Sequence, residues 1–203
     1  MPEAANIVPV SIYTEMTPNP ESMKFVANKL IYPDNVIEFK NEEEAKASPL
    51  ATELFGFPFV RSVFFSQNYI TLSKDQEADW NDIIPEIKEF IRNYLETGGA
   101  VVEQELVKVE EAEDEIKGET STETSDPEIV NKIIEVLDTY IKPAIEMDGG
   151  HIKYKSFSQG VLTLVLQGAC SGCPSATVTL KAGIEGMMNR MVPEVKEVVA
   201  EEL

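Results

Sequence analysis

The sequence predicts an α+β fold in which two small domains of mixed helices and strands are joined by an acidic linker. The chain has 203 residues, of which 43% are hydrophobic, so it exceeds one ordinary domain of about 100 to 150 residues and can form real cores. Short β-type runs alternate with segments of helical periodicity on both sides of one acidic stretch. We expect domains at residues 8–97 and 126–203, with the linker at residues 98–125.

The first domain contains several β-type runs separated by Pro, Asn, Asp and Gly residues, which are typical of turns. The expected strands are Val8–Tyr13, Lys24–Asn28, Val36–Phe39, Val60–Phe65 and Tyr69–Leu72. A helix is expected at Leu50–Phe55, because Ser48 can cap it and Pro49 suits a first helical position. A second is expected from Trp80 to Tyr94, where apolar residues recur at helical spacing after a capping Asp79 or Asn81.

The first domain offers no His, no Cys and no Gly-rich phosphate loop. Its large aromatic side chains, Trp80 and the Phe64-Phe65 pair, are expected in the core, because such residues are usually buried. We therefore expect this domain to recognise partners rather than to carry out chemistry.

The linker is defined by its charge. Its acidic residues are Glu103, Glu105, Glu110, Glu111, Glu113, Asp114, Glu115, Glu119 and Glu123. The only basic residues of the linker are Lys108 and Lys117. Such a segment buries too little apolar surface to offset its chain entropy, so we expect a solvated spacer, with a short helix over Val101–Val109 compatible with the pattern.

The second domain is expected to run helix, hairpin, CxxC loop, helix and strand. Ser125 or Asp126 caps the first helix, whose apolar stripe comprises Ile129, Ile133, Val136, Leu137, Tyr140 and Ile141 and which ends in the region from Pro143 to Gly150. The later elements are a hairpin of His151–Phe157 and Val161–Leu166, a helix over Ala176–Met191 and a strand over Val195–Ala200.

The overall charge limits the function classes. The 17 Lys and Arg residues against 36 Asp and Glu residues give a net charge of −19, which excludes a general binder of nucleic-acid phosphates, because such binding needs clustered cations. No apolar run is long enough to span a membrane, and the amino-terminal residues lack the features of a signal or transit peptide. We expect a cytoplasmic protein with no membrane partner.

Cys170 and Cys173 are the only two cysteines, and they are the candidate ligands. A CxxC pair in a reducing compartment indicates metal binding or redox chemistry. The pair lies after a strand and just before a helix, where the helix dipole is expected to favour thiolates. His151 is expected at the surface or in the hairpin, and Met187, Met188 and Met191 are expected to pack rather than to bind a metal.

Three site chemistries fit a CxxC pair. A [4Fe–4S] cluster takes four Cys ligands, so two chains would each supply Cys170 and Cys173 at a two-fold symmetric site. Zinc shared between chains is a second option, and a dithiol–disulfide oxidoreductase is a third. The residues around this pair differ from a thioredoxin-like site, which usually has an aromatic residue before the motif and Gly-Pro within it.

Longer motifs carry a resemblance to a known family. Asp148-Gly149-Gly150, Gly168-Ala169-Cys170-Ser171-Gly172-Cys173-Pro174-Ser175 and Thr179-Leu180-Lys181 resemble the NifU C-terminal domain of the Nfu iron–sulfur proteins. Thr17-Pro18-Asn19-Pro20, Met23-Lys24-Phe25, Ser48-Pro49-Leu50-Ala51 and Asn68-Tyr69-Ile70-Thr71 resemble the Nfu N-terminal domain. Together these matches cover most of the chain outside the linker.

The resemblance implies that the protein is an iron–sulfur cluster carrier or scaffold rather than an enzyme. It implies a [4Fe–4S] cluster bridged between two chains by Cys170 and Cys173 and passed to apo iron–sulfur enzymes, with a [2Fe–2S] form compatible with the same ligands. The implied partners are these clients, an upstream cluster-assembly scaffold and a second copy of the chain. Mitochondrial relatives carry a transit peptide, so its absence here favours a bacterial cytosol.

Overall fold

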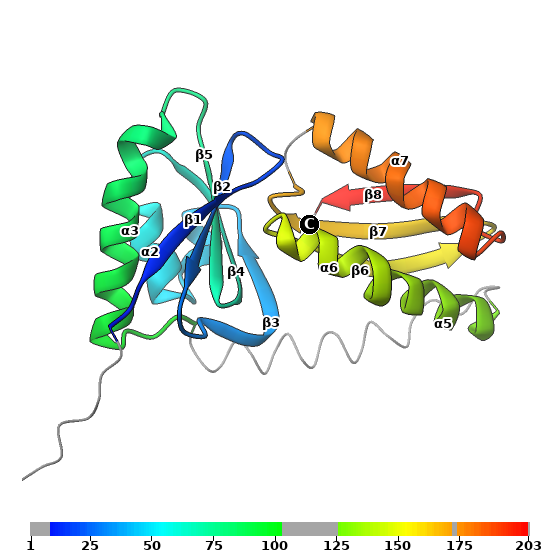
Figure 1. Cartoon of the computed structure of the whole chain (residues 1–203), viewed down its shortest axis with the longest axis horizontal. Helices are drawn as coiled ribbons and strands as arrows, with labels where there is room; N and C mark the ends of the chain where they lie inside the picture. Colours follow the sequence, from blue (N-terminus) through cyan, green and yellow to red (C-terminus); the bar gives the residue numbers. More distant parts are fainter. Residues whose placement is uncertain (1–8, 103–125, 172–173, 203) are drawn as a thin grey trace, which may run out of the picture.

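The computed structural model describes residues 9–102, 126–171 and 174–202. Its helices and strands form two domains, each built from one antiparallel or mixed sheet with helices on it (Figure 1). This confirms the predicted α+β fold. In the described ranges, no helix is both long and apolar enough to cross a membrane.

The first domain is a five-stranded antiparallel sheet in the order β1-β2-β5-β4-β3. Its strands are β1 (Ile12–Met16), β2 (Ser22–Ala27), β3 (Tyr32–Phe39), β4 (Val60–Gln67) and β5 (Tyr69–Lys74). Its helices are α1 (Glu42–Ala45), α2 (Pro49–Phe55) and α3 (Trp80–Thr97). One core joins the sheet to the helices through side chains such as Phe65, Leu54 and Ile87, all fully buried.

The predicted helix starts in this domain are confirmed. The Ser48 side chain accepts a hydrogen bond from the Ala51 amide at α2, and the Asp79 side chain accepts one from the Asn81 amide at α3. Phe64 and Phe65 are fully buried, and Trp80 is partly buried against the core. The short helix α1 was not predicted.

The first strand lies later in the sequence than predicted. It spans Ile12–Met16 rather than Val8–Tyr13, and Val8 lies outside the described residues. The Asn28 side chain bonds the Pro9 carbonyl and the Ser11 amide, both at 3.0 Å. Because a side chain rather than a neighbouring strand satisfies these backbone groups, the regular ladder begins only at Ile12.

The second domain packs helices on one face of a three-stranded sheet in the order β6-β7-β8. Its elements are α5 (Pro127–Val136), η1 (Leu137–Ile141), α6 (Lys142–Met147), β6 (Gly150–Ser158), β7 (Val161–Gly168), α7 (Pro174–Met191) and β8 (Glu197–Glu202). The predicted hairpin is formed by β6 and β7, and β8 runs parallel to β7. This order matches the predicted helix, hairpin, loop, helix and strand.

The first helical region of this domain departs from the prediction at Tyr140. That side chain is 53% exposed, although it was expected in the apolar stripe. Tyr140 lies inside the π-helical turn η1, where the wider turn changes the angular spacing of the side chains. Helix α6 continues past Pro143, which occupies its first turn, and the helix ends at Met147.

The beginning of the predicted linker packs on the first domain. Val101 and Val102 contact its core, and the Ser48 hydroxyl donates a hydrogen bond to the Val101 carbonyl. The expected short helix at Val101–Val109 does not include these two residues, and its remainder lies outside the described residues.

Candidate functional site

Cys170 lies in a tight turn at the end of β7, two residues after Gly168. It is a free thiol, only 8% exposed, and it belongs to the core of the second domain. Helix α7 begins at Pro174, so the predicted position of the motif between a strand and a helix is confirmed. Cys173 lies outside the described residues.

The double-glycine turn before β6 lies directly against the Cys170 sulfur. A Cβ atom added to Gly150 would be 2.5 Å from the Sγ of Cys170 and 3.0 Å from the carbonyl oxygen of Gln167. Only glycine allows this approach without displacing the sulfur or the strand. The Ala169 amide donates a hydrogen bond of 3.2 Å to the Gly149 carbonyl, which fixes the cysteine loop to the same turn.

The Cys170 thiol is held in its neutral form. Burial, followed by the nearby carboxylates of Asp148 and Glu38, raises the pKa of Cys170 to about 12. The prediction that the helix dipole favours a thiolate is therefore wrong for Cys170 in this conformation, because loss of hydration outweighs it.

The first domain contacts the cysteine loop through Glu38 on β3. One carboxylate oxygen of Glu38 accepts hydrogen bonds from the Gly168 amide at 3.1 Å and the Ser171 hydroxyl at 3.0 Å. The Asn19 side-chain amide donates to the Ser171 carbonyl at 3.5 Å. Gly168 and Ser171 are thus both bonded to the first domain.

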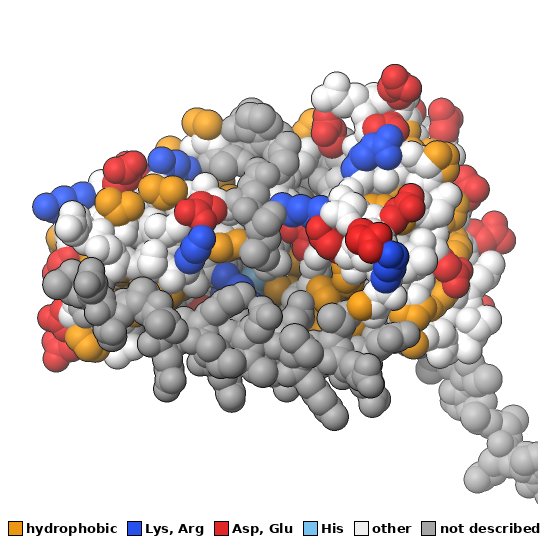
Figure 2. Space-filling view, turned by 180° about the vertical axis from the view of Figure 1, so that it is seen from behind, with side chains coloured by type: hydrophobic (Ala, Val, Ile, Leu, Met, Phe, Trp, Pro, Cys, Tyr) orange, Lys and Arg blue, Asp and Glu red, His pale blue; other side chains and the backbone are white. Residues whose placement is uncertain are grey.

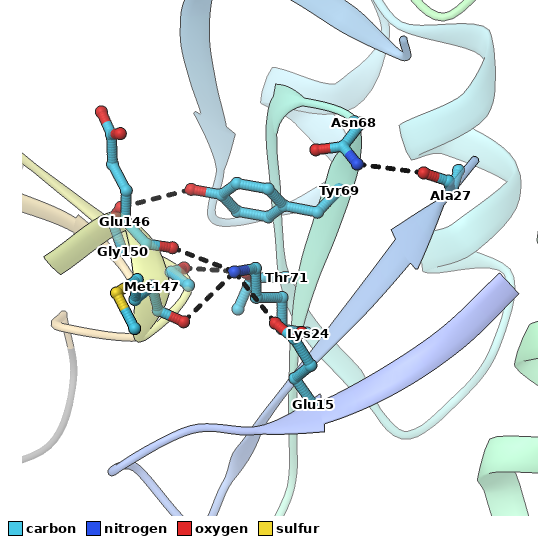
Figure 3. A network of polar contacts seen from close by, with 10 residues as sticks. Glu15, Lys24, Ala27, Asn68, Tyr69, Thr71, Glu146, Met147 and Gly150 are labelled. Atoms are coloured by element: carbon cyan, nitrogen blue, oxygen red, sulfur yellow. Dashed lines mark hydrogen bonds and ion pairs between the residues drawn. The ribbon is translucent and has the colours of Figure 1, made fainter. Parts of the chain in front are cut away.

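A second set of contacts joins the first domain to the double-glycine turn (Figure 3). The ammonium group of Lys24 donates to the carbonyls of Glu146 and Met147, both at 3.1 Å, at the carboxyl end of α6. The Thr71 hydroxyl donates to the Gly149 carbonyl at 2.7 Å. The Tyr69 hydroxyl lies 3.4 Å from the Gly150 carbonyl, as a longer hydrogen bond.

The ammonium group of Lys24 is almost buried, because its side chain is only 10% exposed. It also pairs with Glu15 at 3.1 Å and lies 4.4 Å from the centre of the Tyr69 ring. A positive charge at the carboxyl end of a helix is favourable, because the carbonyl groups there carry partial negative charge.

A cleft of about 400 Å³ opens beside Ser171 where the two domains meet. Its lining includes Asn19, Glu38, Lys40, Arg61, Lys74 and Ser171. On the face shown in Figure 2, acidic and basic side chains are interspersed over both domains.

His151 is buried, with 9% exposure, on strand β6. It was expected at the surface or in the hairpin, and it lies in the hairpin with its side chain buried. Burial, followed by the positive charges of Lys142 and Lys153, lowers the pKa of His151 to about 4, although the Glu146 carboxylate lies 3.8 Å from its Nδ1. Met188 is fully buried in the second core, as expected for a packing residue, and Met187 and Met191 pack against that core.

Sequence reasoning missed Glu38, Lys24 and Thr71 as site residues. Lys24 and Thr71 belong to motifs that resemble the Nfu N-terminal domain. Lys24 is also a charged residue beside apolar residues at the start of an expected strand, and this pattern could have marked it as a contact residue. Among the described residues, no group of three or more His, Cys, Asp and Glu side chains is placed to hold a metal ion.

Comparisons with known proteins agree with these motifs. Residues 12–98 match the family described as "Scaffold protein Nfu/NifU N terminal", and residues 133–199 match the "NifU-like domain". The chain is 39% identical over 188 residues to the human "NFU1 iron-sulfur cluster scaffold homolog, mitochondrial", covering 92% of this chain and 70% of that protein. The protein of the same name from Drosophila willistoni is 40% identical over 188 residues, which span 92% of this chain and 62% of the relative.

A solved structure of a NifU-like protein from Saccharomyces cerevisiae is also similar. It has 29% sequence identity and a TM-score of 0.43, and the match covers 47% of this chain and 86% of that one. The two matched domains and the relatives that share both of them establish that this chain belongs to the Nfu/NifU family of iron–sulfur cluster scaffold proteins.

Proposed function

We propose that this protein binds a [4Fe–4S] cluster between two chains through Cys170 and Cys173 and transfers it to apo-proteins. The observation that carries the proposal is the location of Cys170, at the end of a sheet strand and against a glycine turn, in a chain whose relatives are named iron–sulfur cluster scaffolds. The cluster is the cargo of this protein, and no small substrate is converted. We therefore propose a carrier rather than an enzyme.

Ligand arithmetic supports a site shared by two chains. The sequence has only two cysteines, whereas a [4Fe–4S] cluster bound by thiolates takes four. Two copies meeting at their cysteine loops would supply four thiolates around a two-fold axis. Each thiol loses its proton on binding, because the cluster irons are bound by thiolates.

Transfer would proceed by ligand exchange. An incoming client thiolate forms a bond to one cluster iron as the bond from Cys170 or Cys173 to that iron breaks, and the released thiolate takes up a proton. Repetition at the other irons moves the cluster to the client, and the two chains lose their shared ligand. The expected partners are apo iron–sulfur proteins as clients and an upstream assembly scaffold as donor, with the first domain as the part that recognises them.

The dithiol–disulfide alternative is less well supported, because it needs a reactive thiol. An attacking thiol works best when its pKa is near the ambient pH, whereas burial raises the pKa of Cys170 to about 12. The dithiol–disulfide hypothesis predicts that a colourless monomer reduces disulfide substrates with turnover.

The test is anaerobic reconstitution of the full chain with iron and sulfide, followed by analysis of iron, acid-labile sulfide and native mass. The proposal predicts about two iron and two sulfide per chain in a dimer, with the cluster lost in Cys170→Ser and in Cys173→Ser. Gly183→Ala is a matched control, because this exposed position on α7 has no atom within 4 Å of an added Cβ. A colourless monomer would contradict the proposal, and tightly bound zinc in place of iron would favour a zinc-sharing adaptor.

A further inference from the structure

The sheet of the first domain has two covered faces, and its own helices cover only one of them. Phe65 points into the core with α2 and α3, whereas Phe64, next to it on β4, belongs to a separate buried cluster with Val26 and Tyr69. Neighbouring residues of a strand point to opposite faces. This second face therefore presents an apolar patch, and Phe64 in it is fully buried.

The second domain covers this patch with its cysteine loop and its glycine turn. A Cβ atom added to Gly168 would lie 3.0 Å from a ring carbon of Phe64. One added to Gly149, which has a φ of 81°, would lie 3.0 Å from the Thr71 hydroxyl and 3.4 Å from the Cβ of Lys24. Gly149 in the glycine turn and Gly168 in the cysteine loop thus let the two domains approach each other closely.

The polar contacts around the patch recognise the backbone of the cluster site. Lys24, Tyr69 and Thr71 all donate to carbonyl oxygens of the turn from residue 146 to residue 150. Glu38 accepts from the backbone amide of Gly168 and from the Ser171 hydroxyl. The surface formed by Lys24, Glu38, Phe64, Tyr69 and Thr71, here called the docking face, is therefore complementary to the loop that holds Cys170.

The docking face and a second chain would need the same loop. A bridging cluster requires Cys170 to present its sulfur to another copy, but this residue is 8% exposed, and Gly168 and Ser171 are both bonded to the first domain. We infer that the first domain is a reversible cover for the cluster loop of its own chain, and that it competes with the second chain for that loop. This inference rests on the proposed function.

The chemistry of the docking face suits reversible contact. When the domains separate, water can hydrate the Lys24 ammonium group, which keeps Glu15 from its own domain as a partner. Undocking also frees the backbone carbonyls and amides of the second domain that the docking face had bonded. These groups lie in a turn and a loop, where water can reach them. Undocking therefore leaves the Lys24 charge with both water and Glu15 as partners.

The test compares a docking variant with a matched control in the full chain. The docking variant, Lys24→Met with Thr71→Val, removes the donors to the Glu146, Met147 and Gly149 carbonyls and keeps side-chain size. The control, Lys29→Met with Thr52→Val, makes the same changes where both donors bond carbonyls within the first domain, at Leu95 and Ala45. Glu38→Ala is a second docking variant that acts on the other side of Cys170.

Two measurements are made on each variant. In the apo-protein, hydrogen exchange of the Gly168 amide reports docking, because its acceptor is Glu38 in the first domain. Exchange of the Lys196 amide reports the fold of the second domain itself, because its acceptor is the Gly160 carbonyl in the same domain. The second measurement is the rate at which iron and sulfide enter the protein during anaerobic reconstitution.

The cover predicts that the Lys24→Met, Thr71→Val variant exchanges Gly168 roughly tenfold faster or more, with Lys196 unchanged. It also predicts that both docking variants take up iron and sulfide several-fold faster than the control. Unchanged exchange at Gly168 in the Lys24→Met, Thr71→Val variant, which keeps Glu38 as the acceptor, would overturn the inference. So would faster exchange with no faster uptake, while leaving the proposed function intact. A wild-type chain that takes up no cluster would instead overturn the proposed function, and the role of the cover with it.

Discussion

The carbonyl oxygen of Gly149 accepts two hydrogen bonds, one from the Thr71 hydroxyl at 2.7 Å and one from the Ala169 amide at 3.2 Å. The first comes from the other domain, and the second comes from the residue just before Cys170. A carbonyl has two lone pairs, so one backbone atom can bond both. The glycine turn therefore connects the position of the cysteine loop to the docking of the first domain.

Gly150→Ala is expected to disturb the cysteine loop directly. The added Cβ would lie 2.5 Å from the Cys170 sulfur, and overpacking of this kind typically costs about 1 to 3 kcal/mol. We expect a lower urea midpoint and less iron per chain after reconstitution. Iron content equal to wild type in a variant of reduced stability would show that the close contact between Gly150 and Cys170 is not needed for cluster binding.

Gly183→Ala is expected to stabilise the second domain. Gly183 is an exposed residue inside α7, and an added Cβ would meet nothing within 4 Å. Replacing a glycine inside a helix by alanine stabilises by about 0.5 to 1 kcal/mol. Urea unfolding followed by circular dichroism checks this, with Gly186→Ala as a second position of the same kind. A lower midpoint in both variants would contradict the prediction.

Ser171→Ala is expected to weaken docking without changing a proposed ligand. The Ser171 hydroxyl lies 3.0 Å from a carboxylate oxygen of Glu38 and 2.9 Å from the Gly168 carbonyl, and it can donate to only one of them at a time. Loss of one such bond costs about 0.5 to 1.5 kcal/mol. We expect severalfold faster exchange of the Gly168 amide, with the Lys196 amide as the internal reference. Equal exchange would mean that the hydroxyl bonds Gly168 alone.

The buried His151 predicts a loss of stability in acid. Its pKa is lowered from 6.5 to about 4 in the folded protein, so between these values the unfolded chain binds a proton that the folded chain does not. This contribution is complete above pH 6.5, declines as the pH falls and is lost at about pH 4. From pH 7.5 to pH 5 the expected loss is on the order of 2 kcal/mol.

The measurement is urea unfolding of wild type and His151→Gln at several pH values between 7.5 and 4.5. Carboxylates titrate in both proteins, so the difference between the two pH profiles isolates His151. The wild-type profile is expected to be steeper. Parallel profiles would show that His151 takes up a proton in the folded protein as readily as in the unfolded chain.

Much of the fold could be predicted because its signals are local. Ser48 and Asp79 mark helix starts through their own side chains, and the turn at residues 158–160 follows from composition. The π-helical turn could not be predicted, because no residue type at Leu137–Ile141 specifies it. The Cys170 position was predicted from the strand before it and the helix after it.

The docking face could not be predicted from the sequence. Lys24 and its acceptor Glu146 are 122 positions apart, and Glu38 and Gly168 are 130 apart. Most of the groups recognised on the second domain are backbone carbonyls and amides, which every residue has and which leave no pattern in the sequence. The neutral state of Cys170 was missed for the same reason, because it depends on burial by residues distant along the chain.

Native mass spectrometry of the anaerobically loaded full chain tests the central claim most directly. The account predicts a dimer that carries one cluster of four iron and four sulfide ions, with cluster-free monomers after the cluster is removed by a chelator and an oxidant. Cys170→Ser should leave only cluster-free chains under the same conditions. A cluster carried by a single chain, or a loaded dimer formed by Cys170→Ser, would contradict a cluster shared through these cysteines.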